Sequence, residues 1–375
     1  MRIVHILKGK ANPDTLNGVN RVVHWMATSQ LRLGHEVEVW GLAESMTPPA
    51  HPREYRLRLF PVTRPRVTLA PEIKAALATL SPGTWVHFHS VFIPEYPAIA
   101  RLLTRRGFAY GITPHGGYDP GRFNKHRWRK RLYFAAREAS YLRHAAWIQA
   151  IGVSEIQDIL DLAPRARVML IANCQHSIPA RAAALPSDTE RPLFGYCGRL
   201  ATDHKGLDYL LAGFAAYKAR GGTGELWLIG DGEDRASLER QAATSGAAGQ
   251  VRFLGVRYGE EKLDLVAGFD AFIHSSRWDV LPGACLEAAS LGRPLVVSRE
   301  TNLGEFVERS GAGLVQDETS ANGVARALER VRQLYDNRQL EPMGENARLL
   351  IEKEFRWEEN ARAFVASIRA AVPVV

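Results

Sequence analysis

The chain has 375 residues, of which 46% are hydrophobic and 23% are charged, values typical of globular rather than disordered proteins. This length exceeds one ordinary core and predicts two domains, while no run of 18 apolar residues exists to span a membrane. The net charge of +8 is uneven, because residues 1–185 hold 25 Lys and Arg against 12 Asp and Glu. We therefore expect the first half to face an anionic partner, such as a phosphorylated lipid, a membrane surface or a nucleic acid.

Short apolar runs alternate with helical segments along the whole chain. In the first half, the predicted strands are Arg2–Leu7, Glu36–Trp40, Trp85–Phe88, Ala109–Ile112, Trp147–Gln149 and Val168–Ile171, and the predicted helices lie near 20–33, 94–104, 123–144 and 153–163. In the second half, the predicted strands are Leu193–Gly198, Glu225–Ile229, Val251–Phe253, Ala271–His274 and Pro294–Val297, with helices near 206–219, 233–244, 259–267, 283–291 and 320–335. Such alternation builds parallel sheets covered on both faces. The predicted fold class is therefore α/β, with two doubly wound, Rossmann-like domains facing each other across a cleft.

The domain boundaries are expected where the composition changes. Residues 178–192 are rich in Pro, Ala and polar residues and are predicted to be a linker between domains at 1–177 and 193–354. Ligands of doubly wound folds lie beyond the carboxyl ends of the strands. Functional residues should therefore follow strands in both halves.

The cysteines and the first residues indicate a cellular compartment. Cys174, Cys197 and Cys285 are odd in number and far apart, which predicts neither a disulfide framework nor a zinc cluster and fits a reducing cytosol. The opening MRIVHILKGK is predicted to be a buried strand and not a signal peptide, because it lacks a long apolar core and a cleavage site. We expect a cytoplasmic protein.

A glycine lies at the start of the first predicted helix, where Gly18 and Val19 follow the first strand and a polar loop. Such a position lets a phosphate approach the helix N-terminus. No G-x-G-x-x-G follows that strand, and the one G-x-G, Gly230-Asp231-Gly232, reaches Arg235 where a third glycine belongs. NAD binding is therefore not expected.

Two histidine groups follow or occupy strands of the first half. His115 lies beside Gly116 and Gly117 at a strand end, where it is positioned for a ligand hydroxyl. His87 and His89 share one face of a strand and are predicted to be core or hydrogen-bonded histidines. Because no third ligand accompanies them, we predict no metal there.

The run from Arg122 to Arg137 holds seven basic residues and no acid, with aromatic residues interleaved. This composition predicts a helix lying on an anionic membrane, and a solvated basic helix face is the alternative. Nucleic acid is not expected, because no recognised binding module accompanies the run. The residues predicted to contact the membrane or an acceptor are Arg122, Lys125, Arg127, Trp128, Arg129, Lys130 and Arg131.

Basic residues follow the first strand of the second domain. Gly198 ends the strand, Arg199 comes next, and Lys205 follows six residues later. Glycine lets the backbone approach a ligand, while guanidinium and ammonium groups bind phosphate oxygens. The motif predicts a diphosphate clamp, and two solvated surface bases are the alternative.

Two acids flank a Pro-Gly turn between Ser276 and Pro294, with Asp279 eight residues before Glu287. An acid on a loop, a helix N-terminus and a second acid inside the helix make a compact polar site. Its acids could hold a hydroxyl-rich ligand, and its exposed N–H groups an anion. The alternative is a strand-to-helix turn whose acids merely favour the helix dipole.

Taken together, these motifs resemble the retaining glycosyltransferases of family 4, which have the GT-B fold. The resemblance rests on pieces in the family's order: Asn17-Gly18-Val19, His115-Gly116, Gly198-Arg199-Leu200 with Lys205-Gly206, Leu228–Asp234, Val251–Gly255, and the block from Asp279 through Glu287 to Ser298. The segment 355–365 resembles the family's closing helix, which returns to the first domain, and we expect it to extend over 355–375.

The resemblance implies transfer of a sugar from a nucleoside-diphosphate sugar to a hydroxyl, with retention and without a cofactor or an obligatory metal. Arg199 and Lys205 would hold the diphosphate, Asp279 the sugar hydroxyls and Glu287 the ribose, while His115 would lie near the transferred sugar and the acceptor. The remaining donor-binding residues it implies are Gly18, Val19, Gly198, Val256, Leu281, Pro282, Gly283 and Ala284.

Two departures from the family pattern leave alternatives open. Asp279 stands where the family usually has glutamate, and Asn173-Cys174 stands where it often has Asn-Gly. A nucleotide-sugar 2-epimerase on the same fold is one alternative, and a catalytically silent sugar- or nucleotide-binding assembly protein, favoured by Asp279, is another.

The basic first domain suggests a lipid-linked glycan or polysaccharide precursor as acceptor, at the inner face of the cell membrane. The nucleotide stays open among UDP, GDP and ADP.

Overall fold

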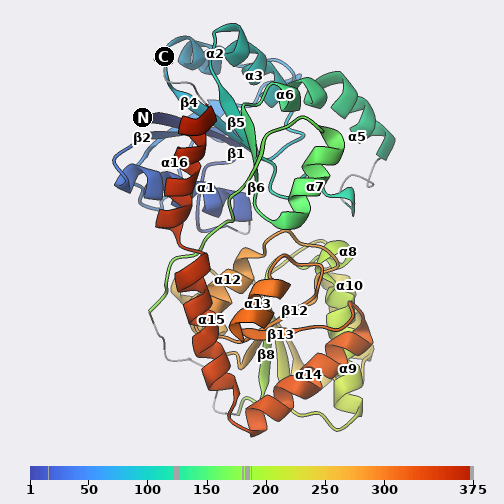
Figure 1. The fold of residues 1–375 in the computed structure, drawn as a ribbon. Helices are drawn as coiled ribbons and strands as arrows, with labels where there is room; N and C mark the ends of the chain where they lie inside the picture. The colour runs from blue at the N-terminus through green and yellow to red at the C-terminus, as the bar shows by residue number, and fades with distance from the viewer. Residues whose placement is uncertain (16, 122–126, 180, 182–185, 187, 372–375) are drawn as a thin grey trace. The chain divides into compact units, whose positions relative to one another are not determined.

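The computed structural model forms two compact units (Figure 1). It describes the whole chain except residues 16, 122–126, 180, 182–185, 187 and 372–375. The first unit comprises Met1–Asn173 and Trp357–Val375, and the second comprises Cys174–Arg356. The segment 178–192, which we expected to be a linker, belongs to the second unit, where Arg181 forms ion pairs with Glu260 and Asp264.

The first unit is built on a parallel sheet with the strand order β3-β2-β1-β4-β5-β6-β7. The strands are β1 (Arg2–Lys8), β2 (Glu36–Ala43), β3 (Arg56–Pro61), β4 (Trp85–His89), β5 (Tyr110–Thr113), β6 (Trp147–Ala150) and β7 (Val168–Leu170). Every residue of β4 is buried, as expected for a strand covered on both faces. The unpredicted β3 is an edge strand in which Arg alternates with Leu.

Helices cover this sheet on both faces. They are α1 (Gly18–Arg32), α2 (Pro71–Ala78), α3 (Tyr96–Arg105), α5 (Arg127–Tyr133), the π turn η1 (Phe134–Glu138), α6 (Ala139–Arg143), α7 (Val153–Leu162) and α16 (Trp357–Ala371). Helix α16, drawn in red, packs along the blue α1 in Figure 1. Its Phe364 ring contacts His5, His87 and Trp147. The last helix therefore completes the core of the first unit.

The second unit has a parallel sheet with the order β10-β9-β8-β11-β12-β13. The strands are β8 (Leu193–Cys197), β9 (Glu225–Ile229), β10 (Val251–Gly255), β11 (Ala271–His274), β12 (Leu295–Val297) and β13 (Gly313–Val315). The helices are α8 (Thr202–Lys205), α9 (Leu207–Ala219), α10 (Arg235–Thr244), η2 (Ala248–Gln250), α11 (Gly259–Ala267), α12 (Gly283–Ser290), α13 (Gly304–Ser310), α14 (Ala321–Asp336) and α15 (Leu340–Glu354).

Both sheets are doubly wound, which confirms the predicted α/β class. In each, the strand order reverses once, between β1 and β4 in the first unit and between β8 and β11 in the second. Ligands of such sheets bind at the carboxyl ends of the strands that flank the reversal. Within the described part of the chain, no helix combines the length and apolar character needed to cross a membrane.

Candidate active site

The turns that follow β8 and β11 are held together in the second unit. Gly206 has φ +61°, and a Cβ at this position would lie 2.1 Å from the carbonyl oxygen of Ser275, so only glycine fits this contact. The Arg277 guanidinium donates to both carboxylate oxygens of Asp208, at 2.7 and 2.6 Å. The Arg277 N–H donates to the carbonyl of His204 at 2.9 Å. These bonds dock the α8 turn onto the segment after β11.

The docked turns bring Lys205 and Asp279 into an ion pair. The sequence assigns these two residues to one site but predicts no contact between them. The Nε2 of His274 lies 3.1 Å from the same oxygen of Asp279, so His274 donates to the carboxylate. Burial by itself would raise the pKa of Asp279. The Lys205 ammonium and the His274 hydrogen bond outweigh burial and hold that pKa well below its ordinary value. Asp279 is therefore a fixed anion.

The loop that carries Asp279 is pinned from both sides. Its backbone pairs with Thr301 in an isolated β-bridge, and the Asn302 amide donates to the carbonyl of Val280 at 2.7 Å. His274 is 2% exposed, and its Nδ1 has no hydrogen-bond partner among the described residues. Sequence reasoning missed His274, whose only signal was its place at the end of β11.

Arg199 differs from Lys205 in its environment. Its side chain is exposed, and among the described residues no carboxylate lies within ion-pair distance of its guanidinium. Its backbone is fixed, because the Tyr196 hydroxyl donates to the Arg199 carbonyl at 2.9 Å. Gly198 precedes it with φ +158°. The first of the two predicted phosphate-binding cations is therefore accessible to an anion, whereas the second is already paired.

Glu287, the second predicted acid, is buried in α12 and held by a cation from another helix. The Lys262 ammonium of α11 lies 2.8 Å from Oε1 and 2.9 Å from Oε2 of Glu287. The two side chains are only 16% and 6% exposed. This pair was not predicted, because nothing local relates a lysine in α11 to an acid 25 residues later.

The other predicted donor-binding residues of this unit surround the start of α12. Leu281 and Pro282 are buried, Gly283 is exposed and Ala284 is partly buried. The first N–H groups of a helix have no intrahelical carbonyl to bond, and a Cβ at Gly283 would meet no atom within 4 Å. Room therefore exists for a ligand at this helix start. Val256 follows β10 and is partly buried, and its carbonyl accepts from Arg257 at 2.9 Å.

In the first unit, Gly18 and Val19 open helix α1. The Asn17 side chain caps the helix by accepting from the Val19 N–H at 3.0 Å. No acidic side chain occupies the first turn, and a Cβ at Gly18 would meet no atom within 4 Å. Internal packing therefore does not explain the glycine, which leaves its surface open to a ligand.

The turn after β5 holds His115 in a constrained conformation. His115 is half-buried and has φ +53°, which is uncommon for a residue with a side chain. The buried Glu155 stabilises the turn, because Oε1 accepts from the Gly116 N–H at 2.5 Å and Oε2 from the Ile151 N–H at 2.8 Å. Sequence reasoning missed Glu155, which lies in an ordinary amphipathic helix.

His87 and His89 are buried and hydrogen-bonded, as predicted. Across the described residues, no group of three or more His, Cys, Asp or Glu side chains could hold a metal ion. No disulfide joins the three cysteines.

The basic run continues into helix α5, which exposes apolar as well as basic side chains. Trp128 is 68% and Leu132 is 66% exposed, and the Arg129 guanidinium lies over the Trp128 ring, 5.1 Å from its centroid. Lys130 and Arg131 lie in the same helix. The predicted contact residues Arg122 and Lys125 lie outside the described residues.

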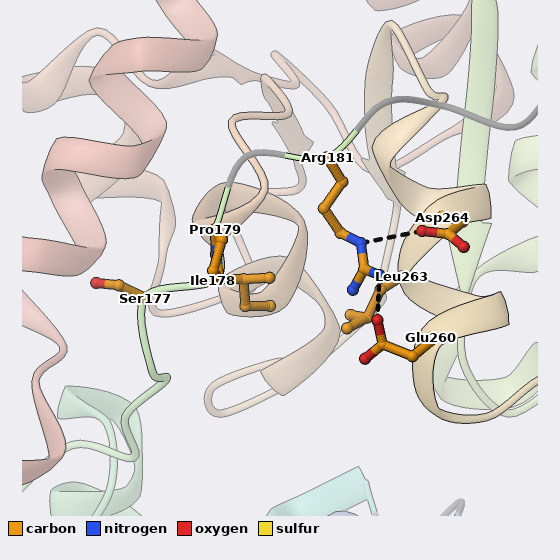
Figure 2. A pocket seen from close by; sticks show the side chains of 7 residues that line it. All are labelled: Ser177, Ile178, Pro179, Arg181, Glu260, Leu263 and Asp264. Atoms are coloured by element: carbon orange, nitrogen blue, oxygen red, sulfur yellow. Dashed lines mark hydrogen bonds and ion pairs between the residues drawn. The ribbon is translucent and has the colours of Figure 1, made fainter.

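A pocket lies on the surface of the second unit, between helix α11 on one side and Ser177–Pro179 with Arg181 on the other (Figure 2). Its lining residues are Ser177, Ile178, Pro179, Arg181, Glu260, Leu263 and Asp264. Figure 2 shows Arg181 reaching Glu260 and Asp264, and its Nε lies 3.0 Å from Asp264. No predicted donor-binding residue lines this pocket, and its charges are paired with one another. We therefore do not place the donor there.

Two models of known protein families match the chain, one in each unit. The family model described as Glycosyl transferases group 1 matches residues 191–333, and the model described as Glycosyltransferase Family 4 matches residues 16–174. The chain is a member of these glycosyltransferases. The two matches cover the strand-end turns that carry Gly18, His115, Arg199, Lys205, Asp279 and Glu287.

Two curated relatives of this chain are named as glycosyltransferases with different roles. The lipopolysaccharide core biosynthesis glycosyltransferase LpsE of Rhizobium meliloti is 28% identical over 51% of this chain and 55% of its own length. The GDP-mannose-dependent alpha-mannosyltransferase of Mycobacterium tuberculosis is 35% identical over 28% of this chain and 25% of its own length. The matched region therefore spans about half or less of these two relatives.

Solved structures show the same GT-B fold over the whole chain. The sucrose-phosphate synthase of Thermosynechococcus elongatus aligns with a TM-score of 0.79 and 18% identity, covering 99% of both chains. Anabaena HepE in complex with UDP-glucose aligns with a TM-score of 0.74 and 16% identity, covering 99% of this chain and 100% of that one. At these identities the likeness shows the fold alone.

Proposed function

We propose that this glycosyltransferase moves a sugar, with retention, from a nucleoside-diphosphate sugar to a hydroxyl of a lipid-linked glycan or polysaccharide precursor. The observation that carries the proposal is the arrangement at the β8–β11 reversal, where Lys205 pairs with Asp279 and where Arg199, which follows β8, is exposed. Cations and a fixed acid at this place suit a ligand that is anionic at one end and rich in hydroxyls at the other. The UDP-glucose complex of HepE and the mannosyltransferase relative support a nucleotide-sugar donor.

The proposed chemistry depends on stabilising the departing diphosphate. The bond between the anomeric carbon and the phosphate oxygen breaks, the acceptor oxygen bonds to that carbon on the same face, and the departing phosphate takes the acceptor proton. The transition state resembles an oxocarbenium ion, so the negative charge that develops on the diphosphate is where the protein can lower the barrier. Arg199, Lys205 and the N–H groups at the start of α12 would provide that stabilisation, and each preorganised donor is worth roughly 3 kcal/mol in such sites.

In each unit, two further residues are proposed to contact the donor, and none of these contacts needs a metal. Asp279 would accept from a sugar hydroxyl and Glu287 from the ribose hydroxyls, while Gly18 would bring a backbone N–H to a phosphate. His115 would accept a hydrogen bond from a hydroxyl of the transferred sugar. Since the leaving charge is met by protein cations, we expect addition of a chelator to leave the transfer rate unchanged.

The deciding experiment incubates the protein with UDP-, GDP- and ADP-sugars, with and without a crude lipid-linked glycan fraction, and measures released nucleotide and the fate of the sugar. Transfer to the glycan, with the anomeric configuration kept, is the expected result. Conversion of the nucleotide-sugar into its 2-epimer without an acceptor would instead establish the epimerase. Binding of a nucleotide in a thermal-shift assay without turnover would establish the silent binding protein.

We further propose that helix α5 rests on an anionic membrane surface, where the acceptor lipid is found. Its exposed Trp128 and Leu132 could enter the interface while Arg129, Lys130 and Arg131 contact headgroups. Sedimentation with anionic vesicles should exceed that with neutral vesicles and fall as salt rises. Trp128→Ala with Arg131→Glu should abolish the difference, whereas Arg220→Glu, an exposed change on the second unit, should not. Equal binding to both vesicle types would refute the membrane role.

A further inference from the structure

A buried chain of hydrogen-bonded side chains leads to His115 from inside the first unit. The Gln30 Oε1 of helix α1 lies 2.7 Å from Nε2 of His5 in strand β1. The Nδ1 of His5 lies 2.9 Å from Nε2 of His89, at the end of β4. The Nδ1 of His89 lies 3.1 Å from Nε2 of His115. We call Gln30, His5 and His89 the imidazole chain.

Burial keeps the imidazole chain uncharged. Gln30 and His5 are fully buried, and His89 is 1% exposed. Burial lowers the pKa of His5 to about 4 and that of His89 well below its ordinary value. A neutral imidazole has one donor nitrogen and one acceptor nitrogen, so the direction of the first bond sets the direction of all the others.

The direction follows from the Gln30 end. The Gln30 Oε1 can only accept, so His5 donates through Nε2 and accepts through Nδ1. His89 then donates through Nε2 to His5 and accepts through Nδ1. His115 must therefore donate its Nε2–H to His89, which leaves Nδ1 as the acceptor nitrogen of the His115 ring.

We infer that the imidazole chain positions His115, by holding its ring as the Nε2–H tautomer with Nδ1 as a hydrogen-bond acceptor. The functional part of this inference rests on the proposed function, in which His115 accepts from a hydroxyl of the transferred sugar. Hydrogen bonds that run in one direction polarise one another, so the chain also strengthens Nδ1 as an acceptor. The residues of the chain touch no reacting atom and are positioning residues.

A proton wire would use the same contacts, but the structure argues against one. The chain ends on the amide of Gln30, which neither accepts nor releases a proton at neutral pH, and whose Nε2 has no hydrogen-bond partner among the described residues. Orientation is therefore the function that the geometry supports.

The neighbouring His87 is also buried, but its hydrogen bonds do not connect it to His115. His87 donates to the hydroxyl of Thr113 at 2.7 Å, and that hydroxyl donates to Gln149. The Gln149 amide ends this second path on the carbonyl of Ile171. Two separate polar paths thus cross the same sheet, and only the imidazole chain reaches the turn after β5.

The first measurement is nitrogen NMR of the wild-type, full-length protein labelled with ¹⁵N at histidine, with His115→Asn used for assignment. The expected spectrum shows His115 as a single Nε2–H tautomer across neutral pH. An Nδ1–H tautomer, or an exchanging mixture, would overturn the inference. Because this readout needs neither donor nor turnover, it stands apart from the proposed function, which fails separately if no nucleotide-sugar reacts.

The second measurement compares Gln30→Leu with Thr28→Val, a buried change on the same helix whose hydroxyl bonds only within α1. Gln30→Leu should convert the His115 signal into a tautomer mixture and lower kcat for sugar transfer roughly 10- to 100-fold, by analogy with the partners that orient metal-ligating histidines. The donor KM should change less than twofold. Thr28→Val should alter neither readout. An unchanged His115 spectrum in folded Gln30→Leu would refute the chain, and an unchanged kcat would refute its role in catalysis.

Discussion

At the residue scale, the two acids of the candidate site are paired with basic side chains of the protein itself. Asp279 is held by Lys205 and His274, and Glu287 by Lys262. Removing one member of such a pair leaves a buried charge without compensation, which usually costs more than removing both. Comparing the single variants of each pair with the double variant therefore distinguishes a loss of stability from a loss of function.

The Lys205–Asp279 pair gives the first prediction. Lys205→Ala should lower the free energy of unfolding by about 1.5–3 kcal/mol, because the half-buried Asp279 carboxylate loses its cation and keeps only the hydrogen bond from His274. Adding Asp279→Asn should recover most of that loss. Urea denaturation of the two single variants and the double variant measures the coupling.

The exposed Arg199→Ala should change stability by less than about 0.5 kcal/mol yet lower kcat about 100-fold. Near wild-type turnover in this variant would refute the diphosphate clamp.

The Glu287–Lys262 pair gives the second prediction. Glu287→Gln should raise the donor KM about tenfold or more, because a hydrogen bond to a charged group is worth about 1.5–3 kcal/mol. Ribose hydroxyls do not react, so kcat should stay within about twofold. Steady-state kinetics distinguish the two effects. Glu260→Gln, which removes another paired acid in the same unit, is the control, and a loss confined to kcat would contradict the assignment of Glu287 to the ribose.

At the element scale, the π turn η1 joins the basic helix α5 to α6 and ends on a buried carboxyl group. Glu138 is fully buried and accepts from the Phe92 N–H at 2.9 Å and from the Tyr118 hydroxyl at 3.2 Å. Burial raises the pKa of Glu138 from 4.5 to about 7. The folded protein therefore keeps a proton there that the unfolded chain has already lost.

This difference predicts a pH-dependent stability. Between the unfolded pKa near 4.5 and the folded pKa near 7, the folded state binds more protons, so the contribution of Glu138 falls as pH rises. Glu138→Gln has no such loss, and its stability relative to wild type should improve by about 2 kcal/mol from pH 5 to pH 8. Denaturant titrations at both pH values test this. Glu72→Gln, an exposed acid on α2, should show no comparable trend; a constant difference for Glu138→Gln would contradict the argument.

The elements of the two sheets were largely predictable because their strands are short apolar runs between helical segments. The exceptions have local causes. Strand β3 alternates Arg with Leu at a sheet edge, β13 is a short strand that begins with Gly313, and α15 contains Pro342 and Gly344. The turns that follow the strands were found from glycines and charges. Their partners, Lys262, His274 and Glu155, were not, because contacts between distant elements leave no trace in local periodicity.

At the scale of the whole molecule, each unit has a core of its own, and that of the first unit is completed by a helix from the other end of the chain. Phe364 of α16 is fully buried against His5, His87 and Trp147, with ring centroids 5.9, 4.7 and 5.1 Å away. The same ring thus lies against His5, one member of the imidazole chain. A defect in α16 should therefore affect the first unit and spare the second.

Phe364→Ala tests this division. A buried Phe→Ala change typically costs 3–5 kcal/mol, and we expect about that loss in the first unit alone. Limited proteolysis followed by mass spectrometry should show cleavage within residues 1–173 while 174–356 resists. The exposed Arg362→Ala, on the same helix, is the control. Equal sensitivity of both units to protease would contradict the independence of their cores.

The return of α16 to α1 also fixes an order of events during synthesis. The residues of the second unit leave the ribosome after the body of the first unit and before its last helix. The first unit must therefore wait for the translation of more than 180 intervening residues before Phe364 can cover its histidines. The second unit can close its own core during that interval, so a nascent chain completes the unit that carries Lys205 and Asp279 before the unit that carries the imidazole chain.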